Sequence, residues 1–443
     1  MKLTRRGFLA AGGALAASTL VPGRLIAAVE RHAPPAPRLS TWAEVRAQFR
    51  LDPRYLHFAS FYLASHPRPV QEAIETFRRA LDANPFLMVE HSMFESELQN
   101  LQLRVCESVA GYIGGRREDL ALTGNTTTGL ALVYHGLKLA PGDEVLTTEH
   151  DHYSHHESIR FATERAGASM RRIALFEEPE NAAVSGIVER IRSAIQPNTR
   201  ALGVTWVHSS SGVRLPIREI AKALGEVNRA REEKDGVLLV VDGVHGLGAV
   251  DERPAEMGCD FFCAGTHKWM FGPRGTGVVW GDPKAWARLR PLVPTFSEKE
   301  SFDSWMRGEP PKGPMVAARM TPGGFTAYEH QWGVGAAFRF HQRIGRERIA
   351  ARIRALNDQC KAGLAGIKRV RLRTPRDPAL SAGLCCFEVE GRAPGDVVKG
   401  LLAHRIVAST SPYRVEYVRL APSLVNSREE VERALVALRK VVA

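Results

Sequence analysis

Two short apolar runs, in VLLVVDGVHGLGAVD at residues 237–251 and in FFCAGTHKWMFGPRGTG at residues 261–277, indicate the fold of this chain. Each run is bounded by turn residues, as expected of a buried β-strand. Asp242 ends the first run, and Lys268 comes shortly after the second run. The two residues are 26 positions apart, about one strand–helix–strand step. We therefore expect both side chains at strand ends of one sheet.

The same alternation of strands and helices extends over much of the chain. Helical periodicity marks residues 70–81 and 95–113, and further strand-like runs lie at residues 143–149, 169–175 and 200–207. Strands separated by helices of this length imply a mostly parallel sheet with helices on both faces. The sequence therefore predicts an α/β fold whose ligand binds at the carboxyl ends of the strands.

The C-terminal part has a different pattern. The segment YEHQWGVGAAFRFHQRIGRERIAARIRALNDQC predicts a long helix or a broken pair, and short strand-like runs and a last helix follow it. Ser427 and Glu430 have capping-box spacing at the start of that helix. The predicted parts are a signal peptide (1–28), a linker (29–45), an N-terminal segment (46–69), a large cofactor-binding domain (70–299), a connecting loop (300–326) and a smaller α+β domain (327–443).

Composition places the chain among ordinary globular proteins. It has 443 residues, of which 44% are hydrophobic and 24% charged, enough for two domains with a large core. The net charge is +12, but the basic residues are scattered and aromatic residues make up only 7%, so we expect no nucleic-acid partner. The six cysteines lack the CxxC pairs of a zinc site and are expected to be buried thiols.

The N-terminus resembles a twin-arginine export signal. Arg5 and Arg6 are followed by Gly-Phe-Leu and a mildly apolar run rich in Ala and Gly. An uncleaved run could instead anchor the chain, although residues 7–21 are few for a full membrane crossing. We therefore expect the export machinery as a partner and the periplasm as the location, reached by a protein that folds around its cofactor first.

Two further segments follow strand-like runs. In LTGNTTTGLALVYHGL, residues 124–128 would open a helix, where backbone N–H groups and hydroxyls can bind an anion or simply cap the helix. In HDHYSHH, residues 150–156, a flat imidazole could stack on a ring. Its histidines also leave a metal-binding periplasmic protein open as an alternative, since His152 would share a helix face with His155 or His156.

Together these segments fit pyridoxal phosphate. A lysine whose pKa is lowered by desolvation can form a Schiff base with an aldehyde. The cofactor also needs a helix N-terminus for its phosphate, a carboxylate for its pyridine nitrogen and a flat partner for its ring. The sequence supplies each of these groups directly after a predicted strand, so no metal is needed in this interpretation.

From about residue 50 to the end, the sequence resembles the class V aminotransferases of fold type I, and within them the group similar to isopenicillin-N epimerase. The resemblance implies a pyridoxal-phosphate enzyme with a large domain built on a mostly parallel sheet flanked by helices, a smaller C-terminal α+β domain, and a homodimer. The matching segments are YLHFASFYLASHPRPV, LTGNTTTGLALVYHGL, PGDEVLTTEHDHYS, HSSSGVRLPI, VVDGVHGLGAVD, GTHKWMFGPRGTG and YVRLAPSLVNSREEVERAL.

The resemblance implies a role for each candidate residue. Lys268 would carry the cofactor and move a proton at the substrate α-carbon, and Asp242 would pair with the pyridinium nitrogen. His152 would stack on the ring, with His150 as the weaker candidate. Arg419 would bind the substrate carboxylate through two parallel hydrogen bonds. Further implied contacts are His245 at the ring hydroxyl, Asn125, Thr126, Thr127 and His267 at the phosphate, and Phe61 and Tyr62 in the substrate-pocket wall.

Some positions depart from the family pattern. Relatives have a Gly-Thr pair before the long helix, whose threonine contacts the partner's phosphate, whereas here Thr321 follows Met320. Desulfurases of this class carry a nucleophilic cysteine near the carboxylate-binding segment, but STSPYRVEYVRL at residues 409–420 has none. The resemblance therefore favours an aminotransferase or an amino-acid epimerase, with C–S or β-elimination lyases of the same fold as alternatives. Lys268 and Asp242 argue against a binding module that has lost catalysis.

Overall fold

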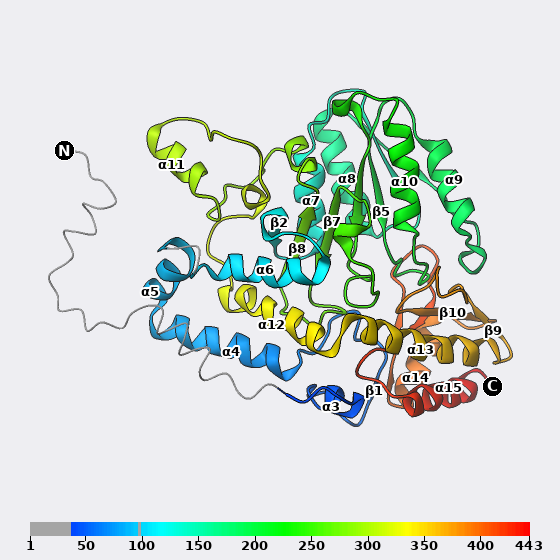
Figure 1. Cartoon of the computed structure of the whole chain (residues 1–443). Helices are drawn as coiled ribbons and strands as arrows, with labels where there is room; N and C mark the ends of the chain where they lie inside the picture. The colour runs from blue at the N-terminus through cyan, green and yellow to red at the C-terminus, as the bar shows by residue number, and fades with distance from the viewer. Residues whose placement is uncertain (1–36, 96–98) are drawn as a thin grey trace.

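The computed structural model describes residues 37–95 and 99–443 (Figure 1). The predicted signal peptide and residues 29–36 of the predicted linker lie outside the described residues. No helix of the described part is long and apolar enough to cross a membrane.

A seven-stranded sheet with the order β2-β8-β7-β6-β5-β3-β4 forms the centre of the large domain. The five strands β3 to β7 are all parallel to one another. Strand β8 runs antiparallel to both of its neighbours, β2 and β7. The predicted α/β fold with a mostly parallel sheet is therefore confirmed. The strands are β2 (Leu120–Thr123), β3 (Glu144–Thr148), β4 (Ser169–Ile173), β5 (Thr199–Thr205), β6 (Leu238–Asp242), β7 (Phe261–Gly265) and β8 (Gly277–Gly281).

Both faces of this sheet are buried along most of its strands, whereas the edge strand β4 is partly exposed. Successive side chains of a strand point to opposite sides, so each strand contributes to two cores. In β6, Leu239 and Val241 pack into one core cluster, and Leu238 and Val240 pack into another. Helices cover both faces, as Figure 1 shows. The first cluster includes residues of α6 (Leu101–Ile113), α9 (Val184–Ala194) and α10 (Ile217–Asn228), and the second includes residues of α7 (Thr126–Gly136) and α8 (Tyr153–Ala166).

Three helices lie side by side below the large sheet in Figure 1. Of these, α12 (Tyr328–Ile344) packs against both α6 and α4 (Arg68–Ala83). Gly345, with a φ of 97°, ends α12, and α13 (Arg346–Ala365) starts directly after it. A positive φ favours glycine, so this residue breaks the long apolar pattern into two helices. Of the two predicted possibilities, the broken pair is therefore confirmed.

The small domain contains an antiparallel sheet with the order β12-β13-β10-β9. Leu56 and Phe58 of the N-terminal segment join its core, since β1 pairs in parallel with β11. The capping box of Ser427 and Glu430 opens the last helix as predicted. The elements are β1 (Leu56–His57), β9 (Val370–Leu372), β10 (Cys385–Val389), β11 (Ile406–Val407), β12 (Ser409–Thr410), β13 (Val418–Leu420), α14 (Pro394–Ala403) and α15 (Arg428–Val442).

Five further helices lie outside the sheet and the helix layers described above. The segment 300–326, predicted as a connecting loop, carries most of α11 and the short helix η7, and α11 extends away from the sheet (Figure 1). These helices are α3 (Trp42–Arg46), α5 (Pro85–Val89), the π-helix η1 (Glu90–Glu95), α11 (Lys299–Arg307) and η7 (Ala317–Met320).

Candidate active site

A pocket opens at the carboxyl ends of the large-domain strands. It is lined by residues that follow β2, β3, β5, β6 and β7, and by the loop between β12 and β13 of the small domain. This is the edge at which parallel sheets bind ligands. The predicted site residues that line it are Phe61, Tyr62, Asn125, Thr126, Thr127, His152, Asp242, His245, His267, Lys268 and Arg419.

Lys268 is half-buried and lies three residues after the end of β7, with its Nζ atom 2.9 Å from Nε2 of His245. Burial lowers the pKa of the Lys268 amine from 10.5 to about 8, an effect that Asp242 opposes and Arg419 reinforces. No carboxylate of the described residues forms an ion pair with this amine. The amine therefore loses its proton more readily near neutral pH than an exposed lysine does, as a nucleophilic amine requires.

Asp242 ends β6 with its carboxylate inside the pocket wall. Its Oδ1 accepts a hydrogen bond from the backbone N–H of Val244 at 3.0 Å. Burial raises the pKa of this carboxyl from 3.8 to about 6, against the effects of the Val244 hydrogen bond and of Lys268. A buried carboxylate is costly without a cationic partner, so a protonated ring nitrogen bound here would relieve that cost.

The phosphate end of the site is formed by the start of α7 and the end of β7. The side chain of Asn125 caps α7 by accepting from the N–H of Thr128 at 2.8 Å, which leaves first-turn N–H groups open to an anion. Thr126 Oγ1 accepts from the N–H of Gly265 at 2.7 Å and joins the two segments. A Cβ at Gly265 would come within 2.7 Å of the His267 ring, so a glycine is needed for this close packing.

The structure separates the two histidines that the sequence left in competition. His152 caps α8, where its Nδ1 accepts from the N–H of Ser154 at 3.2 Å, and its ring lines the pocket. His150 instead stacks on Phe176, with centroids 3.9 Å apart. It also accepts from the N–H of Leu175 at 3.0 Å. Of the two, His152 is therefore the residue available to a cofactor ring.

The other two histidines of HDHYSHH have separate partners. Nε2 of His155 lies 2.6 Å from the hydroxyl of Tyr134, and Nε2 of His156 lies 2.7 Å from the carbonyl oxygen of Thr148. Within residues 37–95 and 99–443, no group of three or more His, Cys, Asp or Glu side chains is arranged to hold a metal ion. The four imidazoles of this segment do not converge.

Arg419 carries a buried positive charge into the pocket from β13. Its Nη1 donates to the carbonyl oxygen of Ser209 at 2.9 Å, and its Nε donates to Oγ of Ser409 at 3.1 Å. The guanidinium also lies 4.8 Å above the ring of Phe61. These partners are all neutral, and no carboxylate of the described residues pairs with Arg419. An anionic substrate group would therefore supply the missing counter-charge.

Two of the aromatic candidates differ in their surroundings. Phe61 is buried and packs against Arg419, whereas Tyr62 lies at the pocket mouth with 70% of its surface exposed.

Thr321 does not join the other predicted site residues in the single chain. It is buried outside the pocket, and its hydroxyl oxygen accepts from the backbone N–H of Leu122 in β2 at 3.0 Å.

Sequence reasoning missed several hydroxyl groups of the pocket. Thr205 is the register partner of Asp242, and its Oγ1 is buried with no hydrogen-bond partner, so a polar ligand atom would satisfy it. Ser209 and Tyr413 also line the pocket and contact one another through their hydroxyls at 2.7 Å. Their only sequence signal was their position in segments that follow a strand or precede Arg419.

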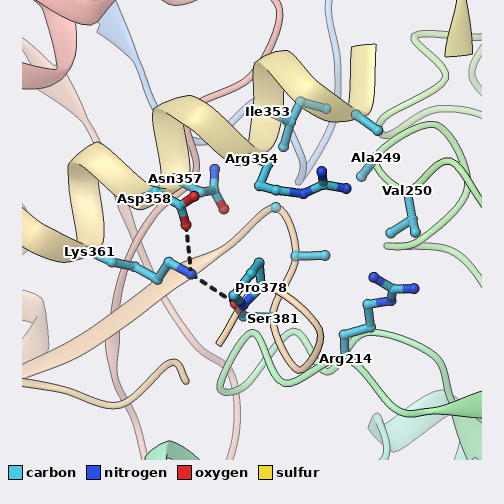
Figure 2. Close-up of a pocket in the computed structure, with 13 residues that line it drawn as sticks. Arg214, Ala249, Val250, Ile353, Arg354, Asn357, Asp358, Lys361, Pro378 and Ser381 are labelled. Carbon is cyan, nitrogen blue, oxygen red and sulfur yellow. Dashed lines mark hydrogen bonds and ion pairs between the residues drawn. The ribbon is translucent and has the colours of Figure 1, made fainter. Parts of the chain in front are cut away.

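A second pocket lies where α13 meets two loops, and it contains three cationic side chains (Figure 2). Each has an acidic partner: Arg214 pairs with Glu252, Arg354 with Asp251, and Lys361 with Asp358. Its charges are therefore already balanced within the protein, in contrast to those of Lys268 and Arg419.

The groups around the first pocket fit pyridoxal phosphate, and comparison with known proteins agrees. Residues 63–421 match the family model described as aminotransferase class-V. The chain is 30% identical to an isopenicillin N epimerase of Streptomyces clavuligerus, across 90% of this chain and 98% of the relative. It is 25% identical to a probable cysteine desulfurase of Methanothermobacter thermautotrophicus, across 75% and 78%.

Solved structures give the same fold. A variant of C-DES with glycine covalently linked to its PLP cofactor superposes with a TM-score of 0.76 at 22% identity, over 89% of this chain and 98% of that one. An apo cysteine desulfurase of Thermococcus onnurineus also gives a TM-score of 0.76 at 22% identity, over 92% and 99%. The chain therefore belongs to the class-V aminotransferase family and is a pyridoxal-phosphate enzyme.

Proposed function

We propose that this enzyme is an amino-acid epimerase that inverts the α-carbon of its substrate. The observation that carries the proposal is the meeting of Lys268, a half-buried amine with a lowered pKa, and Arg419, a buried guanidinium without a carboxylate partner, in one pocket. Similarity supports epimerisation, since isopenicillin N epimerases of Streptomyces clavuligerus and Amycolatopsis lactamdurans are 30% and 27% identical to this chain over about nine-tenths of its length.

The position of each residue indicates its part in the proposed reaction. Bound pyridoxal phosphate supplies an electron sink that makes the α-hydrogen of an amino acid acidic. Asp242 holds a proton on the ring nitrogen, and the start of α7 binds the phosphate. Arg419 orients the substrate carboxylate and so fixes which substituents of the α-carbon face Lys268. Lys268, with a pKa of about 8, takes and returns a proton at that carbon.

A C–S lyase of the same fold is the second candidate, since probable cysteine desulfurases are among the relatives. The persulfide route of a desulfurase needs a reactive cysteine at the site. All six cysteines of the chain are buried, and none lines the pocket. Burial raises the pKa of Cys386 to about 12 and that of Cys106 to about 12, so these thiols stay protonated. These properties favour epimerisation over desulfuration.

The test is a screen of the purified holoenzyme against single amino acids. In each mixture, chiral chromatography measures the inverted amino acid, and separate assays measure the keto acid and sulfide. The expected result is inversion without an accumulating keto acid or sulfide. Keto acid formed in proportion to an added acceptor would identify an aminotransferase, and sulfide would identify a lyase. Either result without inversion would overturn the proposal.

The enzyme is expected to act as a homodimer. Several large apolar side chains near α5 and α11 are exposed, and these two helices lie on the same side of the molecule (Figure 1). An exposed apolar surface of this kind is typical of a protein interface. The exposed residues are Phe86, Leu87, Leu292, Val293, Phe296, Phe302, Trp305, Met306 and Phe325. Light scattering of the purified enzyme should give twice the chain mass, and a Trp305→Glu, Met306→Glu variant should shift toward the monomer.

The periplasm is the proposed location. The support is the Arg5-Arg6 pair with its following apolar run, in a chain whose cofactor must be inserted before export in the folded state.

A further inference from the structure

The side chains that line the pocket form a row along one edge of the large sheet. Lys268 follows β7, His245 follows β6, Ser209 follows β5 and His152 follows β3, and these strands are consecutive neighbours. Adjacent strands lie about 4.8 Å apart, so the ends of β7 and β3 are separated by about 14 Å. Lys268 and His152 therefore enter the pocket from strands three places apart in the sheet.

Tyr413 lies at the His152 end of this row. Its ring packs edge-on against the ring of His152, with centroids 5.9 Å apart and an interplanar angle of 76°. Its hydroxyl lies 2.7 Å from Oγ of Ser209. Arg419 holds the same Ser209 through its carbonyl oxygen at 2.9 Å. The phenol of Tyr413 and the guanidinium of Arg419, the proposed carboxylate-binding group, are therefore both held by Ser209.

We propose that Tyr413 is the second proton-transfer residue of the site and acts on the face of the α-carbon opposite to Lys268. This inference rests on the proposed epimerase function and makes it more specific. Inversion requires a proton to leave one face of the carbon and another to arrive on the other face. A substrate held by Arg419 places its α-carbon between the amine and the phenol.

The protons and electrons of this cycle balance without a co-reactant. In one direction the uncharged amine of Lys268 takes the α-hydrogen as a proton, and bound pyridoxal phosphate would accept the electron pair of the broken C–H bond. The phenol of Tyr413 gives its proton to the opposite face, which forms the new C–H bond and leaves a phenolate. Water then removes the extra proton from Lys268 and returns one to Tyr413. In the reverse direction water first takes the proton of Tyr413 and supplies one to Lys268. The Tyr413 phenolate then takes the α-hydrogen, and the Lys268 ammonium gives its proton to the other face.

The surroundings of Tyr413 suit an acid. Burial raises the pKa of its phenol, although the Ser209 hydrogen bond and the charge of Arg419 oppose this effect. The group therefore remains protonated at neutral pH before the reaction. Ser209 and Arg419 are also placed to stabilise the phenolate once it forms.

The experiment compares Tyr413→Phe with the wild-type holoenzyme in deuterated water. Phenylalanine keeps the packing against His152 and removes only the hydroxyl. We expect inversion to slow by at least about 100-fold, the lower range of general-acid effects. Exchange of the α-hydrogen for deuterium with retained configuration should continue, because Lys268 is intact. The matched control is Tyr417→Phe in the same loop, whose ring lies 5.5 Å from the guanidinium of Arg373 and outside the pocket.

A second measurement does not depend on turnover. In a crystal structure of the wild-type holoenzyme with an α-methyl amino acid, the Tyr413 oxygen should lie across the α-carbon from the Lys268 nitrogen. The inference is wrong if that oxygen lies on the same side as Lys268, or if Tyr413→Phe inverts its substrate at the wild-type rate. It is also wrong if the variant loses cofactor absorbance or α-exchange together with inversion, since the role would then be structural. A wild-type enzyme that never inverts an amino acid would instead refute the proposed function itself.

Discussion

The indole Nε1–H of Trp269 donates a hydrogen bond to Nδ1 of His245 at 3.4 Å. This bond requires Nδ1 to be unprotonated, so the proton of the neutral imidazole sits on Nε2. Burial, and next the charge of Lys268, lowers the pKa of His245 well below its ordinary value, which keeps the ring neutral. Nε2–H can therefore donate to the amine of Lys268 only when that amine is uncharged.

Replacing Trp269 with Phe should raise the pKa of Lys268. Without the indole donor, His245 can place its proton on Nδ1 and accept from a Lys268 ammonium through Nε2. The rate at which the apoenzyme captures pyridoxal phosphate can be measured as a function of pH. The midpoint of this pH profile should move upward from about 8. The control is Trp286→Phe, a buried tryptophan whose indole nitrogen has no hydrogen-bond partner. Equal midpoints in the two variants would disprove the role of Trp269.

Replacing Lys268 with Ala should abolish the attachment of the cofactor to the protein. The wild-type enzyme is expected to absorb in the near-ultraviolet or visible range and to be trapped by borohydride. The Lys268→Ala variant should lose both properties and at least about 1,000-fold in activity, because one residue supplies both the attachment and the proton transfer. Lys284→Ala, at an exposed lysine, serves as the control. A variant that is still trapped by borohydride at the wild-type level would show that another lysine carries the cofactor.

Asp242→Asn should stabilise the apoenzyme at neutral pH while weakening cofactor binding. The folded-state pKa of Asp242 is raised from 3.8 to about 6, so the folded protein binds more protons than the unfolded chain in that window, and stability falls as pH rises through it. This shift corresponds to about 3 kcal/mol, which the uncharged amide would recover. Urea unfolding should show the gain at pH 7.5 and little gain at pH 4. An equal change at both values would contradict the assignment.

Arg419→Gln should raise KM for the amino acid more than it lowers kcat. Hydrogen bonds to charged groups contribute about 1.5–3 kcal/mol, so an increase of roughly 10- to 150-fold is expected. Arg414→Gln provides a matched control, since Arg414 is exposed on the loop before β13. Steady-state kinetics of the two variants measure the difference. The carboxylate assignment fails if both variants have the same KM.

A double substitution of Arg5 and Arg6 by Lys should retain the protein in the cytoplasm. The prediction follows from the twin-arginine pattern of the sequence and is measured by cell fractionation, with cofactor absorbance as evidence that the retained protein has folded. The control is Arg24→Lys, outside the pair. Periplasmic enzyme at wild-type levels in the double variant would rule out this export route.

Much of the large sheet could be predicted because its central strands are continuous apolar runs. Residues 143–149 contain β3, and residues 200–207 contain all of β5 except Thr199. The antiparallel strand β8 (Gly277–Gly281) was not predicted, because its five residues begin and end with glycine and follow a glycine-rich turn. Its position between β2 and β7 depends on tertiary contacts that no local pattern contains.

The site was predicted where a side chain directly follows a strand, as for Asp242 and Lys268. Ser209 and Tyr413 could not be singled out in this way, because a serine in a run of serines and a tyrosine in a loop carry no signal beyond their position near a strand end or near Arg419. Their role depends on the docking of the small domain against the large sheet, which brings residues about 200 positions apart into contact.

The hydrogen bond between Thr321 and Leu122 has a consequence for solubility. β2 is an edge strand of the large sheet, and an open N–H at such an edge can pair with a strand of another molecule. The Thr321 hydroxyl occupies this N–H, and η7 lies against the strand. At a position where family resemblance suggests a phosphate contact, the side chain thus occupies an N–H group through which a strand of another molecule could otherwise add to this edge.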